Sequence, residues 1–160
     1  MGALLALAVL LSGCASVTRV APPQEVAQAR WQGRMAIKVF STPIKAFAAD
    51  FVLAGSPQQG ELTLLTPFGT VLAQLQWSAG AARLETADGK KIVNSEGLDS
   101  LVLQTTGAAL PIAALFAWLQ GNHATADGWA VELENPASGH LVARQTVKEP
   151  HTELKILLER

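Results

Sequence analysis

The stretch Glu61–Trp77, ELTLLTPFGTVLAQLQW, contains two extended segments separated by a single turn. Glu61 to Leu65 is typical of a strand, and the quartet 66–69 (Thr-Pro-Phe-Gly) has the composition of a turn. In the segment after the turn, apolar residues alternate with polar ones, and the apolar set is Val71, Ala73, Leu75 and Trp77. Because successive side chains of a strand point to opposite faces, this stretch predicts paired strands with one apolar face.

The same alternation continues on both sides of this stretch. Strands are predicted around Arg34–Val39, Phe47–Leu53, Ala82–Thr86, Lys91–Asn94, Trp129–Leu133, His140–Gln145 and Thr152–Glu159. Asp88-Gly89 is typical of a hairpin turn between two of them. Before the first strand, Glu25–Trp31 has the composition of a short helix that Gly33 would end.

The alternation is interrupted once, between residues 95 and 121. Ser95 is a suitable cap for a helix running to about Thr105. Pro111 suits the first turn of a second helix, and Gly121 suits its end. The sequence therefore predicts a mainly β protein in which one curved antiparallel sheet holds a helical insert in its concave face. The alternative, a closed and packed barrel, is disfavoured because a small barrel has no room for helices inside.

The N-terminal residues are typical of a bacterial lipoprotein signal. An apolar run from Ala3 ends in Leu11-Ser12-Gly13-Cys14, and Cys14 is the only cysteine of the chain. We therefore expect a signal peptide at 1–13, acylation of Cys14, a flexible tether at 14–24 and one domain at 25–160. No Lys or Arg precedes the apolar run, so we expect the natural leader to be longer.

Composition and motifs offer no support for catalysis. The formal net charge is −1, which gives no electrostatic reason to expect a nucleic-acid partner. His123, His140 and His151 are widely spaced, without a metal-ligand pattern. We found no nucleophile–base pair and no phosphate-binding loop, so we expect no enzymatic activity, metal or cofactor.

Phe68 stands apart from the other aromatic residues because it lies in a turn. Pro67 and Gly69 flank it, which would hold the ring at a loop tip. Two interpretations remain open at this point. The ring either folds back onto the sheet, or it is an apolar finger that touches membrane or acyl chains.

Several motifs, taken in order, resemble one known family. They are the lipoprotein signal at Cys14, Trp31-Gln32-Gly33-Arg34, the stretch Leu62–Gly69, Leu110-Pro111 and the segment Leu115–Gly121. In this order and spacing they resemble the LolB family of outer-membrane lipoprotein receptors of Gram-negative bacteria. The resemblance runs from Cys14 to about Trp129.

The resemblance implies an unclosed β-barrel with a helical lid over an apolar cavity. It also implies a monomer that accepts acylated lipoproteins from the periplasmic carrier LolA and places them in outer-membrane lipid. The family's membrane-insertion loop maps onto Pro67, Phe68 and Gly69. Ala15-Ser16 lack the Asp associated with inner-membrane retention, which favours the outer membrane. The segment after Trp129 is short, so we expect that one or two terminal strands of the family are trimmed.

The apolar faces of the predicted elements supply candidates for lining the cavity, although each is equally compatible with an ordinary core. They are Ile37, Phe51, Leu64, Leu75, Trp77, Leu115 and Trp118. Between Arg19 and Phe47 five basic residues stand against Glu25 alone, and they form either a docking patch for an acidic carrier or a scattered solvated surface. Two rival functions remain: a scaffold lipoprotein that transports nothing, and a lipid hydrolase.

Overall fold

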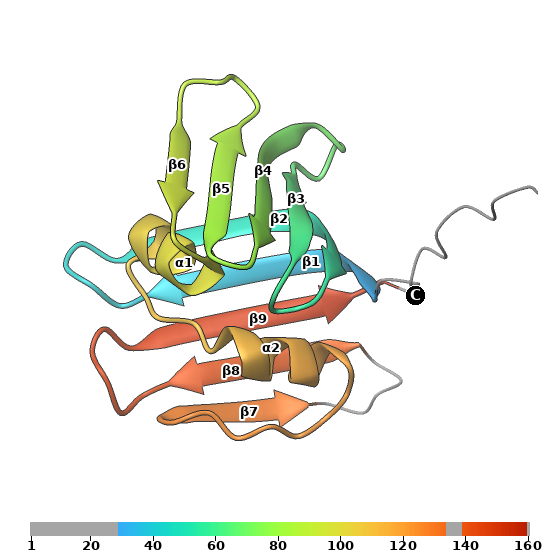
Figure 1. Cartoon of the computed structure of the whole chain (residues 1–160). Helices are drawn as coiled ribbons and strands as arrows, with labels where there is room; N and C mark the ends of the chain where they lie inside the picture. Colours follow the sequence, from blue (N-terminus) through green and yellow to red (C-terminus); the bar gives the residue numbers. More distant parts are fainter. Residues whose placement is uncertain (1–28, 134–138, 160) are drawn as a thin grey trace, which may run out of the picture.

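The computed structural model describes residues 29–133 and 139–159, which form one antiparallel sheet with two helices against it (Figure 1). The first six strands are β1 (Arg30–Val39), β2 (Lys45–Gly55), β3 (Gly60–Leu65), β4 (Val71–Ser78), β5 (Ala81–Thr86) and β6 (Ile92–Ser95). The helices and the last strands are α1 (Leu98–Thr106), α2 (Ile112–Leu119), β7 (Trp129–Leu133), β8 (His140–Gln145) and β9 (Thr152–Leu158).

The nine strands lie in the order β6-β5-β4-β3-β2-β1-β9-β8-β7. Each strand from β1 to β5 pairs with the next one along the chain, and after the helices the chain returns so that β9 pairs with β1. Within the described part of the chain, β6 and β7 are the two edges of this sheet. The sheet is therefore unclosed, as predicted, and the closed-barrel alternative is wrong.

The sheet bends strongly between β2 and β3, so that β3–β6 stand upright beside the flatter β1, β2 and β7–β9 in Figure 1. Both helices lie on the same side of this bent sheet. Their apolar sides are buried there, α1 through Leu98 and Leu101 and α2 through Phe116 among others. The predicted helical insert is thus confirmed.

Alternation in the sequence corresponds to alternation in burial. In β4, Ala73, Leu75 and Trp77 are buried, whereas Gln74 and Gln76 are exposed. The same periodicity in β9 buries Leu154 and Ile156 and turns Glu153 and Lys155 outward. Hydrogen bonds from Lys155 and then Arg144 lower the pKa of Glu153 on that outer face. A period of two is sufficient to assign the inner faces of β4 and β9.

The predicted helix at Glu25–Trp31 is wrong where it can be compared. Arg30 and Trp31 begin β1, and residues 25–28 lie outside the described residues. Gly33 does not end a helix but lies within β1, opposite Phe51 of β2 and Leu158 of β9. Pairing with a strand on each side outweighs a weak local preference for helix.

Gly33 is required by the close approach of β9, and this leads to a prediction. Its φ is +154°, and a Cβ added there would lie 2.0 Å from the backbone oxygen of Leu157. We expect Gly33→Ala to lower the free energy of unfolding by more than about 2 kcal/mol, measured by urea denaturation. Gly80→Ala is the control, because φ is +76° there but no atom lies within 4 Å of the added Cβ. That control should cost only about 1 kcal/mol, and equal losses would contradict the steric explanation.

The helix ends differ in detail from the predictions. Ser95 does not cap α1, because Gly97 is its N-cap residue and Ser95 ends β6, where its hydroxyl accepts a hydrogen bond from Gln104. Pro111 precedes the first turn of α2 as its N-cap, and its carbonyl accepts from the amide of Leu115. Pairing with Ala82 of β5 keeps Ser95 in the sheet and away from the N-cap position of α1.

Candidate functional site

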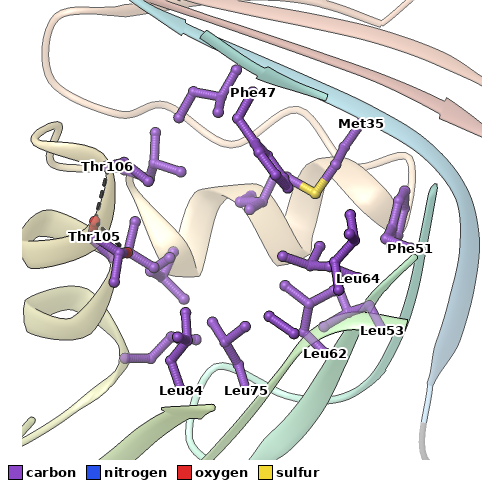
Figure 2. Close-up of a pocket in the computed structure, with 18 of the residues that line it drawn as sticks. Met35, Phe47, Phe51, Leu53, Leu62, Leu64, Leu75, Leu84, Thr105 and Thr106 are labelled. Atoms are coloured by element: carbon purple, nitrogen blue, oxygen red, sulfur yellow. Dashed lines mark hydrogen bonds between the residues drawn. The ribbon is translucent and has the colours of Figure 1, made fainter. Parts of the chain in front are cut away.

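A cavity of about 530 Å³ lies between the inner face of the sheet and the two helices. Its wall is built from β1–β5, from both helices and from Ile156 of β9. In Figure 2, side chains from opposite walls, such as Met35 and Phe47 on one side and Leu75 and Leu84 on the other, point toward a shared central space. The volume falls within the range of about 300–1,000 Å³ that is usual for small-molecule sites.

The wall is almost entirely apolar. The hydroxyl groups of its three threonines already donate hydrogen bonds within the protein. Thr105 Oγ1 donates to the carbonyl of Leu101 and Thr106 Oγ1 to that of Val102, each at 2.8 Å (Figure 2). Thr86 Oγ1 donates to Asp88 Oδ1 at 2.7 Å. The charged lining residues are Lys45 and Lys91, both exposed. The cavity therefore suits a hydrocarbon ligand in its interior, with charge only where it opens to solvent.

Aromatic side chains set the position of α2 on the sheet. Phe116 lies edge-on between Trp31 and Trp77, with ring centroids 5.6 and 6.3 Å away. Both indoles also donate hydrogen bonds, Trp31 Nε1 to the carbonyl of Leu119 at 3.0 Å and Trp77 Nε1 to that of Ser56 at 2.9 Å. Large rings on both sides of Phe116 fix the distance between helix and sheet.

The structure places six of the seven predicted cavity residues on the wall: Ile37, Phe51, Leu64, Leu75, Trp77 and Leu115. Trp118 lies outside it and is a correction to the prediction. Its ring is 2% exposed and packs 6.4 Å from that of Trp129, and its Nε1 donates to the carbonyl of Ala124. At 100° per residue, Trp118 points about 60° away from Leu115 and about 100° away from Leu119 around the helix axis.

The sequence did not predict the lining residues that lie outside the inner faces of the strands. Val102 and the two threonines of α1 line the cavity, and so do Lys45 and Lys91. Leu98, Leu101 and Val102 have the spacing of one apolar helix face in the sequence, so a signal for Val102 was present. No pattern in the sequence indicated the two lysines, because exposed lysines are common on any surface.

Phe68 lies at the tip of the β3–β4 hairpin and is 95% exposed. The ring does not fold back onto the sheet. Thr66 organises the loop, because its carbonyl accepts from the amide of Gly69 and its Oγ1 accepts from the amides of Phe68 and Thr70. Gly69 adopts φ +80°, which an L-residue rarely does. A turn held by hydrogen bonds thus exposes one aromatic ring to solvent.

The predicted basic patch is dispersed where it can be seen. Arg34 pairs with Asp50 at 2.9 Å on the outer face, and that hydrogen bond and charge raise the pKa of the guanidinium. Lys38 lies 4.8 Å from the ring centre of Phe40, whereas Lys45 lines the cavity. The scattered alternative therefore describes these residues better, and Arg19 lies outside the described residues.

The predictions for the N-terminus, Cys14 with the segments 1–13 and 14–24, also fall outside the described residues. Across residues 29–133 and 139–159, no helix has the length and hydropathy needed to cross a bilayer. In the same ranges no three His, Cys, Asp or Glu residues are grouped closely enough to hold a metal ion.

Comparison with known proteins gives one consistent family. The family model described as outer membrane lipoprotein LolB matches residues 27–155. The outer-membrane lipoprotein LolB of Shewanella sediminis is 33% identical over 140 residues, covering 78% of this chain and 58% of that protein. LolB of Shewanella woodyi is 34% identical over 125 residues, covering 74% and 56%. LolB of Dechloromonas aromatica is 26% identical over 177 residues, covering 94% and 90%.

The chain thus spans a little more than half the length of the Shewanella relatives and most of the length of the Dechloromonas relative. The residues matched by the family model include every residue that lines the cavity except Ile156.

Proposed function

This chain belongs to the LolB family of outer-membrane lipoproteins, and from that premise we propose that it accepts acylated lipoproteins and inserts them into the outer membrane. The periplasmic carrier LolA is the proposed donor, and the proposed working form is a monomer anchored through an acylated Cys14. The observation that carries this proposal is the apolar cavity of about 530 Å³ between sheet and helices.

The cavity addresses a physical problem of lipoprotein transport. An acyl chain in water costs about 0.8 kcal/mol per methylene, so a sixteen-carbon chain costs roughly 12 kcal/mol. A protein that carries such a chain must bury it throughout transfer. The lining of Ile37, Leu64, Leu75 and the other apolar residues offers that burial without polar groups that would lose their hydrogen bonds.

Transfer of cargo needs no chemical energy at this step. If carrier and receptor both bury the chains, a difference of about 1.4 kcal/mol between their affinities gives a tenfold preference for the receptor. We propose that cavity affinity alone drives uptake, and that the protein has no enzymatic activity. An ester-hydrolysis assay with a long-chain substrate tests the second statement, since turnover that depends on the folded chain would refute it.

Phe68 is the proposed membrane-contact residue, with Pro67 and Gly69 holding it at the loop tip. Its 95% exposure leaves the whole ring available to enter a bilayer interface. Burial of a phenylalanine side chain contributes about 1.5–3 kcal/mol. That contribution is enough to orient a protein that its lipid anchor already holds at the membrane.

Uptake is tested by mixing the purified chain with LolA that carries a labelled, acylated lipoprotein. We expect the label to move to this chain, and to remain with LolA when the receptor is unfolded beforehand. A scaffold lipoprotein that transports nothing would capture no label, so absence of transfer would refute the proposed function. A lipoprotein lacking its acyl chains is the matched control and should not be captured.

A further inference from the structure

Two cations lie at the opening of the cavity and have no acidic partner among the residues that the structure describes. Lys45 and Lys91 line the cavity and are exposed, and neither forms an ion pair with a carboxylate of the described residues. Other lysines differ in this respect, since Lys90 pairs with Asp88 and Lys148 pairs with Asp127. No Asp or Glu is among the residues that line the cavity.

Lys45 is held at the opening by the end of α1. A Cβ added to Gly107 would lie 3.2 Å from Lys45 Nζ, so this ammonium group lies against the C-terminal turn of the helix. Gly107 is the C-cap residue of α1, and the last turn of that helix has no basic residue of its own. A cation is favoured there because the end of the helix carries partial negative charge. Lys45 therefore spans from the start of β2 to α1 beside the cavity.

Lys91 is positioned by the β5–β6 hairpin. Its amide donates to Thr86 Oγ1 at 3.0 Å, and its carbonyl accepts from the amide of Thr86 at 3.0 Å. The backbone of Lys91 is thus held in place, and both Lys91 and Thr86 line the cavity. The cavity combines an apolar interior with two ammonium groups at its exposed margin.

From this combination we propose that the cavity also binds an anionic lipid, with its acyl chain inside and its phosphate or carboxylate at Lys45 and Lys91. The inference rests on the proposed function, because it uses the same cavity for a hydrocarbon chain. It goes beyond that function because acyl chains on a cysteine are attached through neutral thioether, ester and amide groups and offer no anion. Such a lipid would keep the apolar wall out of water until cargo displaces it.

The test measures displacement of a fluorescent apolar dye from the full chain by single-chain lipids below their micelle concentration. Palmitate and lysophosphatidylglycerol with a sixteen-carbon chain carry an anion, and monopalmitoylglycerol is the neutral match. We expect the anionic lipids to bind about 3- to 30-fold more tightly at low salt, and this preference to shrink as salt is raised. A preference confined to palmitate identifies a free fatty acid as the ligand, and one shared by lysophosphatidylglycerol identifies a phospholipid.

The variants assign the preference to the two lysines. In the double variant Lys45→Gln, Lys91→Gln the preference for anionic over neutral lipids should fall below about twofold, whereas neutral-lipid binding should stay unchanged. Lys90→Gln is the matched control, since Lys90 does not line the cavity, and it should keep the preference. Equal binding of anionic and neutral lipids, or a preference that survives the double variant, would overturn the inference alone. Failure of every lipid to displace the dye would instead contradict acyl binding and thus the proposed function.

Discussion

Phe68→Glu is expected to abolish delivery of lipoproteins to liposomes while leaving folding and uptake of cargo intact. The ring is 95% exposed, so its replacement removes almost no contact within the protein. At the membrane the change removes about 1.5–3 kcal/mol of apolar burial and adds a carboxylate that resists entering the interface. We expect at least a 30-fold loss in the rate of liposome delivery, measured as labelled lipoprotein that floats with vesicles.

Two further variants make this result specific to the loop tip. Phe68→Leu keeps an apolar side chain and should retain delivery. Val147→Glu places the same charge on another exposed apolar position, 74% exposed in the β8–β9 connection, and should deliver normally. Unimpaired delivery by Phe68→Glu would remove the loop from the mechanism without affecting the assignment of the cavity.

Leu64→Trp is expected to prevent uptake of acylated cargo by filling the cavity. Leu64 is half-buried and its side chain reaches into the central space in Figure 2, so the larger indole has room to enter. Enlarging a residue in a packed core usually costs about 1–3 kcal/mol through overpacking. Here we expect a smaller cost, below about 1 kcal/mol, together with at least a tenfold loss of cargo transfer from LolA.

Leu103→Trp is the matched control for this change. Leu103 is 49% exposed on α1 and does not line the cavity, so the same substitution should leave transfer unchanged. Urea denaturation of both variants separates loss of function from loss of fold. If Leu64→Trp accepts cargo as well as the unmodified chain, acyl chains are bound elsewhere.

Most strands were predictable because each satisfies one local rule. In β4 and β9 apolar residues occupy alternate positions, and such residues need no distant information to be assigned to the inner face. The turn containing Phe68 was predictable for the same reason, since Pro67 and Gly69 restrict the backbone locally. The beginning of β1 was not predictable, because Arg30 and Trp31 extend only when β2 pairs with them.

The cavity residues show the limit of periodic patterns. Alternation and helical spacing indicate which side of an element faces the interior, so six of the seven candidates belong to the wall. Trp118 is also apolar and faces the interior, yet it packs against Trp129 within the core and not on the cavity wall. Which interior contact a residue makes depends on elements that are distant in sequence.

The sequence alone predicted the antiparallel strands, the helical insert and the turn that carries Phe68, whereas the tertiary structure showed that this ring is exposed. Only the tertiary structure decided that the inner faces enclose an open space, and that Lys45 and Lys91 lie at its margin. The physical reason is that the alternation of apolar and polar residues determines which way each side chain points. A cavity depends instead on the distance between the sheet and the helices. That separation is set by large side chains such as Trp31, Phe116 and Trp77, which meet only after the sheet has bent around the helices.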